Sequence, residues 1–195
     1  MLWTPPWPEV NNDGMTESTP AGATSQLTDG TAAGHWVLDP AGSRAEFRIK
    51  HFWGIMTVRG ILEQMTGEAT VSPDGTVTGR ISFEAASLNT KNKQRDKHLR
   101  SADFFDVEKH AQAVLTVTSA GPTGPAELRC QGTFEAAGHS RPVTFNAHLR
   151  DATAQSVVVD AELEVDRTEF GMTWSPLHMT AATAIGHVTA RFTRS

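Results

Sequence analysis

The residues of this chain that are best suited to proton transfer or metal binding are its eight histidines, and their spacing supports neither role. No two of them lie at an interval that brings metal ligands together on one element, and the single cysteine, Cys130, offers no second thiol. The glycine-flanked serine of hydrolases, the phosphate loop, the dinucleotide glycine motif and the HExxH zinc helix are all missing from the sequence. We therefore predict no metal, no cofactor and no catalytic residue.

Two histidines carry an alternative hypothesis, an enzyme that acts on a lipid or a quinone. His51 ends a predicted strand and shares the inward parity of Phe47 and Ile49, so its ring either makes a structural hydrogen bond or holds the polar head of a bound lipid. His98 follows Asp96 by two residues, a spacing that keeps the two side chains apart on a helix. A general base needs a positioned partner, and the sequence predicts none for either histidine.

The segment RDKHLRSADFFD (residues 95–106) predicts a short charged helix that ends in two adjacent aromatic residues, Phe104 and Phe105. Both rings cannot face water without exposing about 300 Å² of aromatic surface, so at least one should insert into the barrel. The inserted ring then either seals a packed core or lines the entrance to a cavity. We expect this helix to cover one mouth of a curved sheet or barrel.

From Trp36 onward, polar and apolar residues alternate, which predicts strands with one wet face and one dry face. The longest alternating runs would extend about 30 to 36 Å at about 3.3 Å per residue, which suits the tilted strands of an elongated barrel. Strict alternation also favours antiparallel pairing. Gly79 and Gly132 fall in the middle of such runs and indicate either a bulge or room for a guest molecule. The predicted fold class is all-β.

Length and composition predict one domain preceded by a tail. Residues 1–33 are rich in Pro, Gly, Ser and Thr and show no periodicity, so we expect them to be disordered or loosely docked, with the folded domain at residues 34–195. Met15 is an alternative start of translation. Cys130 shares the parity of Leu128 and Phe134 and is expected to be a small buried side chain.

Charge and hydropathy exclude several classes of partner. The net charge of −5 and the pI of about 5.9 leave no basic field for nucleic acid. No run of residues is long and apolar enough to span a membrane, and the N-terminus lacks the basic and apolar regions of an export signal. The expected compartment is the cytoplasm.

Four segments, taken in order along the chain, resemble the YceI-like family of lipocalin-like polyisoprenoid-binding proteins. They are LDP at 38–40 with Ser43, Phe47, Lys50 and His51; SLNT at 87–90 with RDKHLRS at 95–101 and DFFD at 103–106; GHSRPV at 138–143; and DRTEFG at 166–171. The sequence departs from the family pattern at Gly42, where a histidine is usual, at Leu62 and Met65, where aromatics are usual, and at His110, where a tyrosine is usual.

The resemblance implies an antiparallel eight-stranded lipocalin-like barrel with a short helix near its opening. It also implies a long apolar channel that binds an isoprenoid or a fatty amphiphile without catalysis, often in a homodimer. Leu62 and Met65 in place of rigid rings would make the channel wall more adaptable. The candidate ligand-binding residues are Phe47, Ile49, His51, Trp53, Ile81, Phe83, Phe105, Leu115, Phe134, Phe145, Met172 and Trp174.

A third hypothesis is a barrel with a filled interior that serves as an interaction or stress-response module. A continuous cavity would favour ligand binding, a filled interior would favour the interaction module, and a histidine and a carboxylate together in a wet cavity would favour an enzyme.

Overall fold

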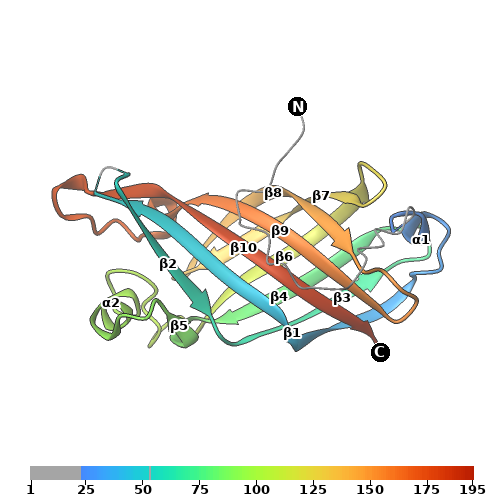
Figure 1. Cartoon of the computed structure of the whole chain (residues 1–195), viewed down its shortest axis with the longest axis horizontal. Coiled ribbons are helices and arrows are strands. Elements are labelled where there is room, and N and C mark those ends of the chain that lie inside the picture. Colours follow the sequence, from blue (N-terminus) through green and yellow to red (C-terminus); the bar gives the residue numbers. More distant parts are fainter. Residues whose placement is uncertain (1–22, 53) are drawn as a thin grey trace, which may run out of the picture.

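The computed structural model describes residues 23–52 and 54–195 and shows an elongated antiparallel barrel (Figure 1). Two short α-helices and three 3₁₀ helices accompany the strands: α1 (Ser25–Thr28), α2 (Lys93–Leu99), η1 (Ala85–Ser87), η2 (Arg167–Phe170) and η3 (Pro176–His178). The strands are β1 (Gly34–His51), β2 (Met56–Leu62), β3 (Met65–Val71), β4 (Val77–Glu84), β5 (Leu88–Asn89), β6 (Gln112–Pro122), β7 (Glu127–Ala136), β8 (His139–Arg150), β9 (Ser156–Asp166) and β10 (Thr180–Arg194).

The barrel closes because β10 pairs with β1, which joins the two ends of the sheet. Strands β2 and β3 both pair with β1 and are separated only by Glu63 and Gln64, so together they form one side of the wall. Strand β5 has two residues and pairs only with β2. The wall is therefore eight-stranded and antiparallel, and the predicted fold class is confirmed.

A bulge in β1 changes which parity faces the interior. The register with β10 shifts between Asp39 and Arg44. The Ser43 hydroxyl donates to the Asp39 carbonyl at 2.7 Å and accepts the backbone N–H of Arg191 at 2.9 Å. Before the bulge Trp36 is buried, and after it Ala45 is buried, so the inward set moves from even to odd positions.

Gly132 and Gly79 both adjoin irregular pairing. Gly132 lies beside the register shift between Val117 and Ser119, and a methyl group on it would come within 1.9 Å of the Thr116 carbonyl oxygen. Gly79 lies at the register shift between β4 and β6. The sequence predicts either a bulge or room for a guest molecule at these glycines. Gly132 fits the first role, because the backbones of β6 and β7 approach closely at this bulge.

Helix α2 lies at one end of the barrel and is shorter than the predicted helix over residues 95–106, because residues 100–106 form turns. The Asn92 side chain caps its first turn by accepting the Arg95 N–H at 3.1 Å. Buried Asp96 accepts the Thr90 N–H at 2.9 Å, and the Arg95 guanidinium donates to the Thr90 carbonyl at 3.0 Å. These bonds fasten α2 to the segment after β5.

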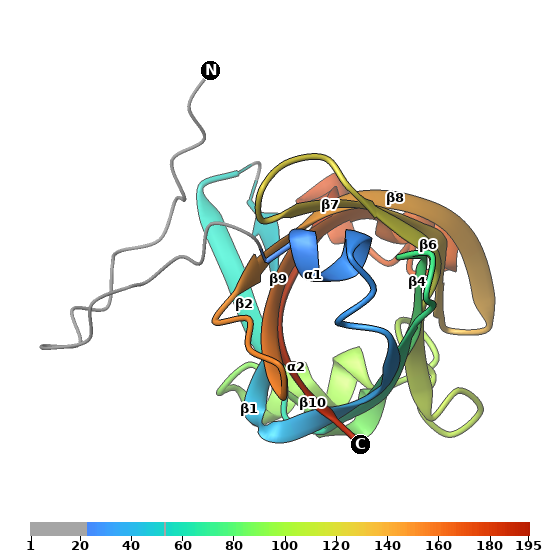
Figure 2. The same ribbon diagram turned by 90° about the vertical axis from the view of Figure 1, so that its right-hand side faces the viewer.

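At the other end of the barrel, α1 lies across the opening (Figure 2). Ala23, Leu27 and Ala32 are buried there, and the Thr24 hydroxyl donates to the Pro125 carbonyl at 2.9 Å. Three side chains of the segment that we expected to be disordered or loosely docked thus pack against the core, whereas Asp29 and Thr31 are exposed. The division into a tail at 1–33 and a domain at 34–195 remains a prediction. Residues 1–22, including Met15, lie outside the described residues.

The half of the interior next to α2 is filled by aromatic and aliphatic side chains. Phe83, Phe104 and Leu88 are buried there, and the rings of Phe134 and Phe170 meet edge to face with centroids 5.5 Å apart. Of the adjacent pair Phe104 and Phe105, Phe104 is the buried ring, and it lies against the rings of His98 and Trp174.

No helix among the described residues has the length and apolarity that crossing a membrane requires.

Candidate ligand-binding cavity

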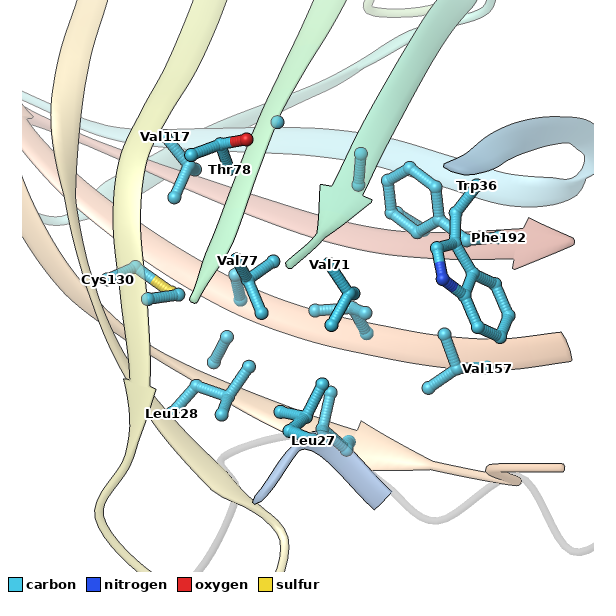
Figure 3. Close-up of a pocket in the computed structure, with 18 of the residues that line it drawn as sticks. Leu27, Trp36, Val71, Val77, Thr78, Val117, Leu128, Cys130, Val157 and Phe192 are labelled. Atoms are coloured by element: carbon cyan, nitrogen blue, oxygen red, sulfur yellow. The ribbon is translucent and has the colours of Figure 1, made fainter. Parts of the chain in front are cut away.

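The half of the barrel nearer α1 contains a cavity of about 150 Å³. Figure 3 shows side chains from several strands converging on it. The wall is almost entirely apolar. Prominent lining residues are Leu27 of α1, Trp36 of β1, Val117 of β6, Leu128 of β7, Val157 of β9 and Phe192 of β10.

Small side chains facing one another across neighbouring strands leave this space. Gly79 of β4 is paired with Ala69 of β3, and Ala147 of β8 is paired with Ala161 of β9. All four residues line the cavity. Larger side chains at these inward positions would fill the interior, as they do in the half of the barrel next to α2.

Trp36 and α1 together close the outer side of the cavity. The Trp36 indole N–H donates to the Ala32 carbonyl at 3.0 Å, so the polar atom of the ring is satisfied and its apolar edge faces inward. The guanidinium of Arg194 lies 5.5 Å from the centre of the Trp36 ring. Leu27 projects from α1 into the same space.

Cys130 lines the cavity and is buried, as expected from its parity. Burial raises the pKa of the Cys130 thiol to about 11. The thiol is therefore protonated at neutral pH and behaves as a small apolar side chain, because the nucleophilic form of cysteine is the thiolate.

Few polar residues are among those that line the cavity. Glu68 of β3 and Arg80 of β4 are direct cross-strand partners, and both are exposed. They alternate with the inward residues Ala69 and Gly79, so their side chains stand on the outer face of the barrel. Gln26 of α1 and Thr153 also belong to the lining. A wall with so few polar groups suits the apolar part of a ligand.

The candidate residues from the sequence fall into three groups. Ile81, Leu115 and Phe145 line the cavity. Phe83, Phe134 and Met172 belong to the packed half of the interior, where Phe47 and Phe105 also lie against the core. Ile49 and His51 are half-buried near the end of β1, Trp174 is exposed, and Trp53 lies outside the described residues. Contact of these residues with a ligand remains a prediction.

Neither histidine considered as a general base borders the cavity. His51 Nδ1 lies 2.7 Å from the Thr180 hydroxyl. This contact corresponds to the structural hydrogen bond that the sequence allows as the alternative to holding a lipid head group. His98 Nε2 lies 3.0 Å from the Asp103 carboxylate, so a histidine–carboxylate pair does form, with Asp103 and not with Asp96. The His98 ring also meets the Trp174 ring edge to face at 4.4 Å.

Several lining residues were not among the candidates. Trp36 and Phe192 occupy inward positions of predicted strands, so the alternation of polar and apolar residues could have identified them as lining residues. Leu27 was missed because the tail shows no periodicity. Within residues 23–52 and 54–195, no three His, Cys, Asp or Glu side chains are grouped as metal ligands.

The fold and the cavity together define a β-barrel of the class that can enclose a small apolar molecule. A family model described as the YceI-like domain matches residues 36–192, and the chain belongs to this family.

Relatives and solved structures agree with this assignment. The chain is 33% identical over 121 residues to protein YceI of Escherichia coli O157:H7, with 60% of this chain and 62% of that protein covered. It is 29% identical to a UPF0312 protein of Vibrio cholerae, over 60% of this chain and 64% of the relative, so the match spans less than two thirds of either relative.

Two solved structures share the fold at low sequence identity. Burkholderia cenocepacia BcnA superposes with a TM-score of 0.72 at 16% identity, over 79% of this chain and 98% of that chain. A polyisoprenoid-binding domain from Saccharophagus degradans, implicated in plant cell wall breakdown, superposes with a TM-score of 0.67 at 14% identity, over 82% and 98%.

Proposed function

We propose that this protein binds an isoprenoid or a similar amphiphile without catalysis, with the apolar chain in the cavity beneath α1. The observation that carries the proposal is the apolar cavity formed by small residues at inward positions. The Saccharophagus degradans structure, whose fold this chain shares, is described as polyisoprenoid-binding.

The size of the cavity limits how a ligand enters. A cavity of about 150 Å³ accepts a molecule the size of benzene in other proteins, which corresponds to about one isoprene unit. In the described residues the interior is filled at the α2 end, so the long channel that the family resemblance implies is shortened here to a cavity in one half. A longer chain therefore needs space that α1 occupies.

Energetics lead to the same conclusion. Burying the five carbons of one isoprene unit contributes about 4 kcal/mol at about 0.8 kcal/mol per carbon. Loss of translational and rotational freedom alone costs about 4 kcal/mol or more. Useful affinity therefore requires two or more buried units, and we infer that α1 moves aside to admit them.

Helix α1 has four residues, and its N-cap residue, Thr24, makes no side-chain capping bond to it. The flanks of the helix are bonded to the barrel, because the Thr24 hydroxyl donates to the Pro125 carbonyl and the Arg194 guanidinium donates to the Thr31 carbonyl. The helix can therefore move aside only if these bonds break or act as hinges. Its apolar side chains occupy the volume that an incoming chain would take. A ligand chain can therefore replace the contacts of Leu27 with similar apolar contacts of its own.

The non-catalytic part of the proposal rests on the placement of reactive groups. The His98–Asp103 pair is at the α2 end, whereas the cavity is at the α1 end. The thiol in the cavity wall is protonated at neutral pH. These placements favour carriage of a ligand over its conversion.

Two substitutions that change the volume of the cavity in opposite directions test the proposal. Ala147→Leu adds bulk inside the cavity and should abolish uptake of farnesol and geranylgeraniol, measured by native mass spectrometry and by organic extraction. Leu128→Ala enlarges the cavity and should preserve or increase uptake. Both variants must show the circular dichroism of the parent barrel. Equal uptake by parent and Ala147→Leu, or no uptake by any folded form, would contradict the proposal.

A further inference from the structure

Two turns, between β1 and β2 and between β9 and β10, lie at the end of the barrel opposite α1 (Figure 1). Both carry exposed apolar side chains. The turn between β1 and β2 presents Phe52, Ile55 and Met56, and the segment between β9 and β10 presents Trp174 and Leu177. Ile55 is 84% exposed and Leu177 is 78% exposed. The turns are adjacent because His51 and Thr180 are paired in the β1–β10 ladder. We call these five residues the apolar tips.

The backbone at the tips adopts conformations that bulky residues avoid. Phe52 has φ of 52° and Leu177 has φ of 51°, both in the left-handed region. Such conformations are disfavoured for large side chains and concentrate at functional positions. The rings of Phe52 and Trp174 are partly packed within the chain, against His51 and His98. The aliphatic side chains of Ile55, Met56 and Leu177 are the more exposed part of these turns and are available to a partner.

A basic groove lies on the outer face of β1 and β2, and its Arg48–Arg59 pair is three register positions from the His51–Met56 pair at the tips. Arg44, Arg48, Arg59 and Lys91 line it, together with Glu46. Arg48 stands directly opposite Arg59 in the β1–β2 register, and like charges in that position destabilise a sheet.

Acidic neighbours offset part of this charge. Arg48 pairs with Glu162 at 3.1 Å, and Arg44 pairs with Glu46. Among the described residues, no carboxylate is paired with Arg59 or Lys91. The groove is therefore suited to an anionic group from another molecule.

We propose that this end of the barrel docks on an anionic membrane surface, with the apolar tips inserted and the basic groove facing phosphate headgroups. Tryptophan, phenylalanine and aliphatic residues beside cations are the composition that partitions into the lipid interface. Because the whole chain has a net charge of −5, its attraction to anionic lipid has to come from the basic groove. This attraction weakens as the salt concentration rises.

A second copy of the chain fits this surface less well. A standard protein interface buries about 800 Å² on each partner, whereas the tips are a few side chains on two projecting turns. A symmetric contact around the tips would also bring the arginines of two grooves toward each other. The membrane proposal does not depend on the ligand cavity, which lies at the other end.

Vesicle flotation of the full chain, without added ligand, tests the proposal. We expect flotation with vesicles of phosphatidylcholine and phosphatidylglycerol, and weaker flotation with phosphatidylcholine alone. Ile55→Ser combined with Leu177→Ser should weaken binding at least about tenfold, because two aliphatic side chains no longer leave water. Arg59→Glu should remove the preference for anionic vesicles. Val37→Ser is the matched control, because Val37 is 41% exposed near the α1 end and should not affect binding.

Three results would overturn the proposal. The first is a parent chain that does not float with anionic vesicles at low salt while its circular dichroism shows a folded barrel. The second is equal binding by the tip variant and Val37→Ser. The third is a dimer in sedimentation that the tip variant dissociates, with no vesicle binding, which would assign the tips to a contact between copies.

Discussion

A single buried side chain, Arg167, organises the turn that follows β9. Its guanidinium donates to the carbonyls of Ala181 at 2.9 Å, Trp174 at 3.2 Å and Thr180 at 3.3 Å, and also to the Met172 carbonyl. One planar donor group thus satisfies carbonyls from both sides of the turn. The role of the arginine in the segment DRTEFG is therefore to hold the base of the turn that carries Trp174 and Leu177.

We predict that Arg167→Met lowers the free energy of unfolding by about 3 kcal/mol, because several buried carbonyls lose their donor. Arg167→Lys should recover only part of this loss, since an ammonium group cannot reproduce the planar fork. Urea titration measures both effects. Arg129→Met is the control, because Arg129 is exposed on β7 and should change stability by less than about 0.5 kcal/mol. If Arg167→Met lowers the free energy of unfolding no more than Arg129→Met does, water replaces the guanidinium as the donor to these carbonyls.

At the scale of elements, α1 controls access to the cavity in our proposal. We predict that Leu27→Ala increases the rate at which an apolar maleimide labels Cys130 by at least about tenfold, because three carbons no longer hold α1 in place. The midpoint of thermal unfolding should change little, since α1 opens separately from the strands. Labelling is followed by mass spectrometry.

The control for this measurement is Val37→Ala, which shortens an exposed side chain of β1 near the same end. It should leave the labelling rate unchanged. A similar rate for Leu27→Ala and the parent chain would mean that Cys130 is reached by another route.

At the scale of the whole molecule, ligand binding is linked to stability, because the closed barrel forms the cavity and the unfolded chain does not. A ligand at 100 times its dissociation constant should stabilise the fold by about 2.7 kcal/mol. For a chain of this size that corresponds to a rise in Tm of about 5 to 10 °C. Differential scanning calorimetry with geranylgeraniol measures the shift. The Ala147→Leu variant should show none, and an equal shift in both proteins would place the ligand outside the cavity.

The local pattern of the chain was sufficient to predict the strands. Side chains of a strand alternate between two faces, so the runs around Phe83, Phe134 and Phe145 indicated half-buried antiparallel strands from sequence alone. The charged segment with Phe104 and Phe105 indicated the helix at one end, although α2 ends at Leu99. Three of the four segments that resemble the family lie where the structure shows specific side-chain hydrogen bonds: at the bulge after Asp39, at the attachment of α2 and at the turn after β9.

The position of the open volume was not predictable in the same way. Free space depends on which inward residues meet across the barrel, and Gly79 is paired with Ala69 only because of the register that β3 and β4 adopt. The bulge between Asp39 and Arg44 changes the inward parity within one strand, which alternation alone does not reveal.

The sequence by itself determined the antiparallel all-β class, the family and the apolar character of the interior, because these follow from the alternation and from local segments. Only the tertiary structure decided that the open half of the barrel lies beneath α1 and that the half near α2 is filled. The physical reason is that cavity volume is a sum over side chains brought together from distant strands, whereas alternation records only the neighbours of each residue along the chain.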